Sequence, residues 1–488
     1  MEVKDLQPQA VFKIFDEITK VPRPSKKEEK IRQYLVNFAN IHGLECKVDE
    51  IGNVVIKKPA TPGYENAQTV ILQGHMDMVC ESNDKGFDFE NNPIKTIIDG
   101  EWVKADGTTL GADNGIGVAA SLAAVTDPTL IHGPLEVLVT VDEETGMTGA
   151  FNLDKSLISG SILLNLDSED DAEIFVGCAG GIDTVCTFGY TPVAAPENYH
   201  YFKVDVSGGL GGHSGGDIHL GHANANKVLA RFLWNLQQAG NVALAEIDGG
   251  NLRNAIPRAA HAIIGVASDR KEDVRIEFNK YVADIENEYK GLETTLKLEL
   301  ETVEPPTTCV DMATSEKLIA AIYSAPHGVV SMSRDLEGLV ETSTNLASVK
   351  MRDNNTIVVT TSQRSSVESR KLDIANQVEA HFKLAGALVE HGEGYPGWQP
   401  NLESQIMKIT SDAYEQLFGI KPAIKAIHAG LECGLFKSVM PQLDMVSFGP
   451  TLRGVHSPSE RMHIPAVDRF WKHLRRVLEM VAEEKTNK

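Results

Sequence analysis

The fold class of this chain is indicated by the stretch TVILQGHMDM, residues 69–78. Its first half, Thr69–Gln73, is nearly all apolar or β-branched, as expected for a short strand that is buried on both faces of a parallel sheet. Leu135–Val141 and Ile162–Leu166 have the same character, and the helical pattern of Gly115–Val125 lies between the first two runs. This β-α-β order predicts an α/β domain in which helices cover a mixed, mainly parallel sheet.

A second domain is expected in the middle of the chain, because 488 residues exceed the ~250–300 that one core usually serves. Two strand-then-helix pairs occur there, Tyr201–Val206 with Ala225–Leu236 and Asn355–Thr361 with Leu372–Ala385. We expect residues 191–390 to form an inserted α+β lid domain of two similar halves. Residues 1–190 and 391–488 are expected to form the interrupted α/β domain.

Local signals near the start of the chain predict a helix and a hairpin. Ser25-Lys26-Lys27-Glu28 is typical of a capping box, and apolar residues at helical spacing follow it as far as Gly43. A turn at Gly52-Asn53 then separates two strand-like runs, Cys46–Asp49 and Val54–Lys57.

Composition excludes several classes of function. Subtracting 68 acidic from 46 basic residues gives a net charge of −22, a field that repels nucleic acid and anionic membranes. The N-terminal residues lack the apolar segment of a signal peptide, and no run of about 18 apolar residues occurs. The six cysteines are scattered, which favours reduced thiols. We therefore expect a cytoplasmic protein without nucleic-acid or membrane partners.

Five short motifs at the ends or edges of the apolar runs carry residues suited to chemistry. They are Gly74-His75-Met76-Asp77-Met78, Leu110-Gly111-Ala112-Asp113-Asn114-Gly115, Asp142-Glu143-Glu144-Thr145-Gly146, Asn165-Leu166-Asp167-Ser168 and Gly454-Val455-His456-Ser457-Pro458. Each alone has an ordinary explanation: a hydrogen-bonded edge histidine, a solvated acidic turn, or glycines that serve turn geometry. Together they place carboxylates at the edge of a core with no basic residue nearby in sequence, and imidazole plus carboxylate ligands suit zinc.

The whole chain resembles a known family in a set of motifs that occur in order. These are GHMDMV, TTLGADNGIG, DEETGM, LNLDSE, GGHSGG, RNAIP, HAGLECG and HSPSE. The set is similar to that of the aminoacyl-histidine dipeptidases, also called cytosol non-specific dipeptidases, of the di-zinc aminoacylase/carboxypeptidase superfamily. The resemblance implies two divalent metal ions, zinc in the first place, with cobalt or manganese as alternatives.

The resemblance also implies a role for each motif residue. His75 and Asp167 would bind one ion, Glu144 and His456 the other, and Asp113 would bridge the two. Asp77 would orient the ring of His75, and Glu143 would be the general base that deprotonates a water shared by the ions. The bridging hydroxide would then attack the peptide carbon. Relatives share a cis peptide after the bridging Asp, so we expect a cis Asp113–Asn114 bond.

Four further residues would contact the substrate, and three of them, His213, Asn254 and Arg364, lie in the expected lid. The resemblance assigns His213 as a donor to the developing oxyanion and Arg364 as a clamp for the free carboxylate of a dipeptide. Asn254 and the backbone at Gly430 would make further contacts. Alternatives stay open for all four: a histidine that stiffens a glycine turn, a surface salt bridge for Arg364, and turn residues for the other two.

The function expected from these residues is metal-dependent hydrolysis of small peptides, namely dipeptides with free termini, including Xaa-His dipeptides. An amidohydrolase that cleaves N-acyl amino acids is an alternative with the same fold. A non-catalytic relative is disfavoured, because it would be expected to lose metal ligands or the base, and all are present. A duplicated lid would allow one chain to supply His213 to its own site, so the sequence is compatible with a monomer or a homodimer.

Overall fold

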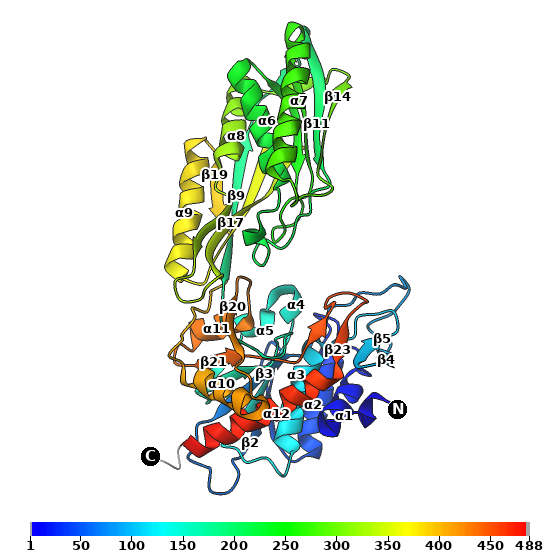
Figure 1. Ribbon diagram of the computed structural model, residues 1–488, viewed down its shortest axis with the longest axis vertical. Coiled ribbons are helices and arrows are strands. Elements are labelled where there is room, and N and C mark those ends of the chain that lie inside the picture. Colours follow the sequence, from blue (N-terminus) through cyan, green and yellow to red (C-terminus); the bar gives the residue numbers. More distant parts are fainter. Residues whose placement is uncertain (1, 485–488) are drawn as a thin grey trace. The chain divides into compact units, whose positions relative to one another are not determined.

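The computed structural model describes residues 2–484 and divides the chain into two compact units (Figure 1). The first unit consists of Met1–Cys178, Trp398–Ala426 and Leu431–Lys488, and the second of Ala179–Gly397 and Ile427–Gly430. Residue 1 and residues 485–488, which the expected α/β domain includes, lie outside the described residues.

The first unit is built on a mixed sheet. Its strands are, in spatial order, β1 (Glu45–Val48), β2 (Val54–Lys58), β6 (Leu135–Thr140), β3 (Val70–His75), β7 (Ile162–Asn165), β21 (Asp444–Ser447), β8 (Glu173–Cys178) and β20 (Ala423–Ile427). The inner strands β6, β3, β7 and β21 run parallel, whereas β1, β2 and β8 pair antiparallel with their neighbours. The expected mixed sheet is thus confirmed, with its parallel part at the centre.

Helices cover both faces of this sheet. They are α1 (Gln9–Ile18), α2 (Glu29–Ile41), α3 (Ala112–Thr126), α4 (Glu143–Gly146), α5 (Thr148–Phe151), α10 (Gln405–Phe418), α11 (Glu432–Val439) and α12 (Ile464–Glu483), with 3-10 turns η1 (Val3–Asp5) and η2 (Lys155–Leu157). A Cβ on Gly74 of β3 would lie 3.5 Å from Val118 of α3. The next residue back, Gln73, points to the other face and contacts Glu432 of α11. A separate small sheet has the order β22 (Leu452–Arg453), β23 (Arg461–His463), β5 (Trp102–Ala105), β4 (Thr96–Asp99).

The predicted capping box at Ser25 is wrong. Helix α2 begins at Glu29, and its N-cap residue, Glu28, makes no capping hydrogen bond. The Ser25 hydroxyl donates to Asp77 instead, at 2.8 Å, and Glu28 accepts from the backbone amide of Asp142 at 3.0 Å. The side chains of Ser25 and Glu28 therefore stabilise the loops around Asp77 rather than the start of the helix, because buried carboxylates need hydrogen-bond donors.

The second unit has a larger sheet flanked by helices. Its strands are, in spatial order, β14 (Lys297–Val303), β11 (Tyr199–Ser207), β13 (Ala260–Ala267), β12 (Ala243–Gly249), β17 (Val340–Arg352), β18 (Thr356–Ser365), β9 (Gly180–Gly189) and β19 (Leu388–His391), and β16 (Gly328–Met332) pairs with β17. The strands β10 (Pro192–Ala194) and β15 (Thr308–Val310) form a separate antiparallel pair. Its helices are α6 (Ala225–Ala239), α7 (Lys271–Glu288), α8 (Met312–Ser324) and α9 (Glu368–Leu384), with 3-10 turns η3 (Ile218–Leu220) and η4 (Ser268–Arg270).

The expected two similar halves are present and meet at the antiparallel pair β12–β17. Outward from that pair the order is β12-β13-β11-β14 on one side and β17-β18-β9-β19 on the other. Along the chain, β11-α6-β12-β13-α7-β14 corresponds to β9-α8-β17-β18-α9-β19. The sequence-based prediction paired β11 and α6 with β18 and α9. In the structure, β18 and α9 correspond instead to β13 and α7. The whole first half is inserted between β9 and α8, which hides the true repeat.

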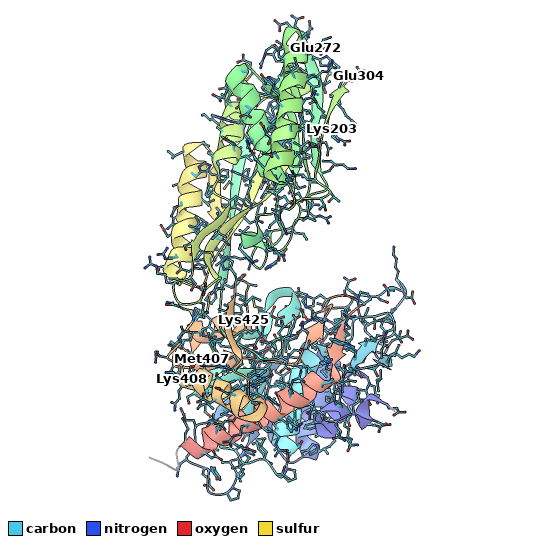
Figure 2. The ribbon with its side chains drawn as sticks, in the orientation of Figure 1. Lys203, Glu272, Glu304, Met407, Lys408 and Lys425 are labelled. Carbon is cyan, nitrogen blue, oxygen red and sulfur yellow. The ribbon has the colours of Figure 1, made fainter. Side chains whose placement is uncertain are left out.

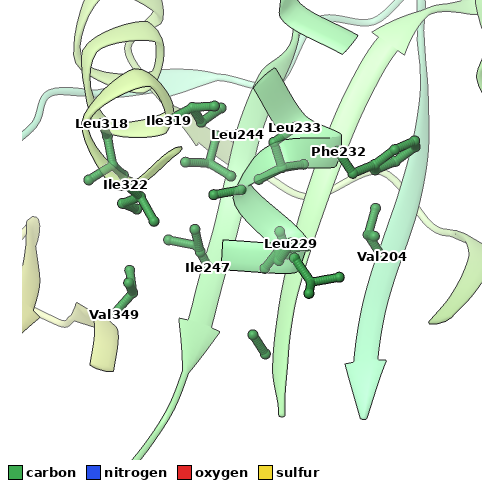
Figure 3. Close-up of a cluster of buried hydrophobic side chains, with 14 of the residues drawn as sticks. Val204, Leu229, Phe232, Leu233, Leu244, Ile247, Leu318, Ile319, Ile322 and Val349 are labelled. Atoms are coloured by element: carbon green, nitrogen blue, oxygen red, sulfur yellow. The ribbon is translucent and has the colours of Figure 1, made fainter. Parts of the chain in front are cut away.

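One hydrophobic core spans both halves of the second unit (Figure 3). Leu229, Phe232 and Leu233 of α6 and Leu318, Ile319 and Ile322 of α8 pack over Val204, Leu244, Ile247 and Val349 of the sheet. Burial of each such side chain stabilises the fold by about 1.5–3 kcal/mol. Ion pairs at the surface contribute less, at most ~1 kcal/mol each. Two of them involve lysines labelled in Figure 2: Lys203 lies 2.7 Å from Asp205, and Lys408 lies 2.8 Å from Glu403.

The boundaries between the units differ from those expected. The first unit ends at Cys178 rather than residue 190, because β9 pairs along its whole length with β18. Residues 391–397 also belong to the second unit, where Tyr395 and Gly181 exchange backbone hydrogen bonds of 2.8 and 3.0 Å. Among residues 2–484, no helix is both long enough and apolar enough to cross a membrane.

Candidate metal centre

His75 is the last residue of β3, and its ring is held from one side by Asp77. Nδ1 lies 3.3 Å from Asp77 Oδ1 and 3.2 Å from the Asp77 carbonyl oxygen. Both side chains are at most 1% exposed. Because one ring nitrogen is engaged, the other, Nε2, is fixed in direction and remains available as a donor atom for a metal ion.

Asp113 faces two histidines with its two carboxylate oxygens. Oδ1 lies 3.1 Å from His75 Nε2, and Oδ2 lies 3.3 Å from His456 Nε2. Asp113 is in the first turn of α3, two residues after the N-cap Gly111 at φ +69°, and the expected cis Asp113–Asn114 bond is present. A carboxylate with one oxygen toward each of two imidazoles has the arrangement of a bridging ligand.

Glu143 and Glu144 begin α4, which follows directly from β6. Their backbone amides donate to the two oxygens of Asp77, at 3.1 and 3.2 Å. The turn into α4 is made by Asp142 at φ +53°. Glu144 Oε2 lies 3.0 Å from His456 Nε2, whereas Glu144 Oε1 is buried and has no hydrogen-bond partner among residues 2–484.

Asp167 and His456 complete the predicted ligand set. Asp167 follows β7, and its Oδ1 lies 3.3 Å from His75 Nε2 without forming a hydrogen bond in the described chain. His456 lies in the loop between β22 and β23, at φ +61°. The five predicted ligands therefore form two groups that share Asp113: His75 with Asp167, and His456 with Glu144.

The electrostatics of the site favour a bound cation. Burial raises the pKa of Asp167 well above its usual range, and burial together with nearby Glu432 and Glu144 raises the pKa of Glu143 to about 8. Hydrogen bonds to Asp113 and Glu144 raise the pKa of His456 to about 11. Buried carboxylates outnumber the imidazoles, so positive charge is what this site lacks.

The donor set fits divalent metal ions. Two imidazole nitrogens and carboxylate oxygens are ligands for zinc, and also for manganese or cobalt. His75, Asp113 and Glu144 offer ligand atoms that all lie within 4.8 Å of one another. The unpartnered oxygens of Glu144 and Asp167 provide donor atoms for ions.

Arg23 and Glu460 lie close to this site and were missed by the sequence analysis. The Glu460 carboxylate accepts from the backbone amides of residues 110–113, at 2.7–3.3 Å. The Arg23 guanidinium donates to the carbonyls of Met76, Asp77 and Gly111. Glu460 stands in the HSPSE motif and could have been singled out there, whereas Arg23 gave no comparable signal.

A buried row of polar side chains under the ligand-bearing strand ends was also missed. Glu432 accepts from Gln73 at 2.6 Å and from Thr140 at 2.9 Å, and Asn165 donates to Gln73 at 2.5 Å. Ser447 continues the row with a 2.5 Å bond to Asn165. The row crosses β6, β3, β7 and β21, and burial raises the pKa of Glu432 to about 8.

The second unit gathers the predicted substrate-contacting residues at one end of β17 and β18. His213 Nδ1 accepts from the amides of Gly215 and Gly216, at 3.3 and 2.9 Å. This leaves the proton of a neutral ring on Nε2, which can then donate. Burial and the nearby Arg364 lower the pKa of His213, which favours that neutral form. His213 therefore does stiffen a glycine turn, and its outer nitrogen remains a donor.

Arg364 is buried, at 6% exposure, so the alternative of a surface salt bridge is wrong. It donates to Ser214 Oγ at 3.3 Å and to the Tyr395 hydroxyl at 2.7 Å, and no carboxylate of residues 2–484 pairs with it. Gly430 lies against Tyr395, since a Cβ there would come within 2.9 Å of that ring. Asn254 is exposed, and its carbonyl accepts from the Ser214 amide at 2.8 Å.

Comparison with known proteins identifies the family of this chain. The model of peptidase family M20/M25/M40 matches residues 71–480. The chain is 44% identical over 481 residues to the cytosol non-specific dipeptidase of Escherichia coli K12, which covers 98% of this chain and 99% of that protein.

Solved structures give the same result. The aminoacylhistidine dipeptidase of Vibrio alginolyticus is 44% identical, covers 98% of both chains and superposes with a TM-score of 0.91. A tripeptidase from Staphylococcus aureus, 16% identical over 98% of this chain and 100% of that chain, has a TM-score of 0.61 and shares the fold. The fold and these similarities lead to one conclusion: the chain belongs to peptidase family M20/M25/M40, among the relatives of the cytosol non-specific, or aminoacyl-histidine, dipeptidases.

Proposed function

We propose that this protein is a metal-dependent dipeptidase that hydrolyses dipeptides with free termini, including Xaa-His dipeptides. The observation that carries the proposal is the position of Asp113, with one carboxylate oxygen toward His75 and the other toward His456. In the proposed holoenzyme, His75 and Asp167 would hold one divalent ion, His456 and Glu144 would hold the second, and Asp113 would contribute a carboxylate oxygen to each. The names of the Escherichia coli and Vibrio relatives support the substrate class.

When bound, the ions would supply Lewis acidity, which would lower the pKa of a water from 15.7 toward 7 and polarise the peptide carbonyl. Glu143 is the general base in this proposal: it takes a proton from the attacking water and passes it to the departing amine. Its position supports this role, because Glu143 is fixed through its amide to Asp77 beside Glu144, and neither of its carboxylate oxygens is used by a hydrogen bond in the described chain.

The second unit supplies the proposed groups that recognise the ends of the substrate. Arg364 is a buried cation without a carboxylate partner in residues 2–484, a state that a substrate carboxylate would relieve. His213 donates from Nε2 to the carbonyl oxygen, where negative charge develops during attack. Asn254 and Gly430 line the same part of the second unit. An enzyme that holds the free carboxylate and the reacting carbonyl together selects short peptides.

Zinc is the proposed ion, because nitrogen and oxygen ligands of this kind suit it well. The cytoplasm is the proposed location, supported by the name of the Escherichia coli relative. The protein acts as a monomer or a homodimer in this proposal, since the second unit of the same chain already carries His213.

Hydrolysis assays separate this proposal from the alternatives. The full-length protein is assayed on Ala-His and on N-acetylhistidine, before and after removal of metal by a chelator and after addition of zinc, manganese or cobalt. We expect cleavage of Ala-His only, its loss with chelator and its return with metal. Preferential cleavage of N-acetylhistidine would instead identify an amidohydrolase, and cleavage of neither substrate would indicate a non-catalytic relative.

The variant Glu143→Gln tests the base. It keeps the size of the side chain and removes its ability to take a proton. We expect loss of Ala-His cleavage by at least a thousandfold with unchanged zinc content. Activity within tenfold of the unaltered protein would remove Glu143 from this role.

A further inference from the structure

The side chain of Glu460 holds the loop that carries Asp113. Oε2 accepts from the backbone amides of Leu110 and Gly111, at 2.7 and 3.0 Å, and Oε1 accepts from those of Ala112 and Asp113, at 2.8 and 3.3 Å. Glu460 itself is 2% exposed. Four consecutive amides thus converge on one carboxylate, and the last of them belongs to the proposed bridging ligand.

The same residue lies in the loop that carries His456. Its amide donates to the Ser457 carbonyl at 3.0 Å, which closes the turn that follows His456. Glu460 is therefore a direct physical link between the Asp113 loop and the His456 loop. These two ligands face each other across 3.3 Å, so their separation depends on where this carboxylate stands.

The opposite side of the Asp113 loop is held by Arg23. Its guanidinium donates to the Gly111 carbonyl and, at 3.1 and 2.8 Å, to the carbonyls of Met76 and Asp77. The loop amides therefore face the Glu460 carboxylate, and the Gly111 carbonyl faces the Arg23 guanidinium. These charge-assisted hydrogen bonds fix the position of the loop. Glu460 uses both of its oxygens on this loop, so it has no oxygen left over as a metal ligand.

We propose that Glu460 is a positioning residue that sets the place of the Asp113 carboxylate relative to His456, and through it the affinity for the two ions and the rate of hydrolysis. This inference rests on the proposed function, in which Asp113 bridges the ions. In Glu460→Gln, the side-chain NH2 would face two backbone donors in either orientation of the amide, so one half of the clamp on the Asp113 loop would open.

A matched control distinguishes positioning from general stability. Glu136 is also 2% exposed, and it accepts from the amides of Ser159 and Gly160 at 3.0–3.1 Å. It lies near the start of β6, whereas the proposed ligand Glu144 follows the far end of that strand. Glu136→Gln therefore removes a comparable buried charge from the same unit without touching the Asp113 loop.

Three measurements are made on the unaltered protein and both variants. They are zinc affinity by calorimetry, the melting temperature of the metal-free protein, and kcat and KM for Ala-His. For Glu460→Gln we expect zinc affinity 10- to 100-fold weaker and kcat at saturating zinc at least tenfold lower, with KM within threefold. Glu136→Gln should lower the metal-free melting temperature by a similar amount and leave zinc affinity and kcat within twofold.

The inference would be overturned if Glu460→Gln had the zinc affinity and kcat of the unaltered protein and differed only in a lower melting temperature. If Glu460→Gln does not fold, Glu460→Asp takes its place, because it keeps the charge and shortens the reach. It should then bind zinc at least threefold more weakly, and unchanged binding would count against the inference. Absence of zinc binding or hydrolysis in the unaltered protein would instead refute the proposed function.

Discussion

The backbone amide of Glu143 donates a 3.1 Å hydrogen bond to Oδ1 of Asp77. That oxygen also lies 3.3 Å from His75 Nδ1, and the other oxygen accepts from the Glu144 amide at 3.2 Å. One buried carboxylate therefore fixes the ring of one proposed ligand and the start of the helix that carries the second ligand and the base. Its hydrogen bonds and His75 hold the pKa of Asp77 at about 2, although burial alone would raise it.

Replacement of Asp77 by Asn should impair metal binding and catalysis together. The amide cannot accept from two backbone donors with both of its atoms, so the ring of His75 and the first turn of α4 lose their common anchor. We expect zinc affinity to fall 10- to 100-fold and kcat to fall by at least that factor. Calorimetric zinc titration and initial rates on Ala-His provide the measurement.

Asp444→Asn is the control for that variant. Asp444 also accepts from two backbone amides, those of Gln405 and Ile406 at 3.0 and 3.1 Å, and it belongs to the same unit. It should leave zinc affinity unchanged. If Asp77→Asn and Asp444→Asn changed zinc affinity and kcat by the same factor, Asp77 would contribute only to folding.

Replacement of Arg364 by Ala should raise KM for dipeptides. The buried guanidinium is the proposed partner of the substrate carboxylate, and loss of a charge-assisted hydrogen bond of about 2–3 kcal/mol corresponds to roughly 30- to 150-fold. Zinc content should stay unchanged, because Arg364 belongs to the second unit and the proposed ligands to the first.

Arg231→Ala, also in the second unit, serves as the comparison for Arg364. Its guanidinium pairs with both oxygens of Glu288 at 2.7 and 2.9 Å at the surface. This variant should keep KM within twofold. An unaltered KM in Arg364→Ala would exclude the proposed carboxylate clamp.

The first unit should lose stability in mild acid because of His473. This residue of α12 is 3% exposed, its Nε2 donates to the Thr410 carbonyl of α10 at 2.7 Å, and burial lowers its pKa to about 4. The unfolded chain binds the proton more readily, with a pKa near 6.5. The stability contribution is therefore complete above pH 6.5 and falls as the pH is lowered toward 4, by about 2 kcal/mol at pH 5.

Hydrogen exchange of the α10 and α12 amides, measured with chelator present at pH 7.5 and 5.0, checks this value. In His473→Gln, which retains a donor for Thr410, this part of the pH dependence should disappear. An equal loss of opening free energy in both proteins would contradict the assignment to His473.

Much of the site was predictable because its ligands follow strand ends. His75, Glu144 and Asp167 come directly after runs whose apolar pattern identifies buried strands, and parallel strands bring their ends together. The ligand roles of all five residues came from the family resemblance, and the loops of His456 and Asp113 have no such strand pattern. Contacting atoms of these five side chains lie 3.0–3.3 Å apart, and their metal-binding role stays a proposal.

The partners of the loops were not predictable from local sequence. Glu460 and Glu432 reach backbone or side-chain groups about 350 residues away, and no periodicity signals such contacts. Ser25 had the spacing of a helix cap, yet its hydroxyl donates to Asp77, because the tertiary fold brings a buried carboxylate within reach. The offset in the repeat of the second unit has a similar cause, since β9 and α8 are far apart in the chain.

Diffraction from crystals saturated with zinc, recorded at the zinc absorption edge, tests the central claim most directly. We predict two anomalous peaks ~3.5–4 Å apart. One should lie among His75, Asp167 and Asp113, and the other among His456, Glu144 and Asp113. A fully occupied pair of ions elsewhere, or a single saturated ion with Asp113 outside its coordination, would contradict the account.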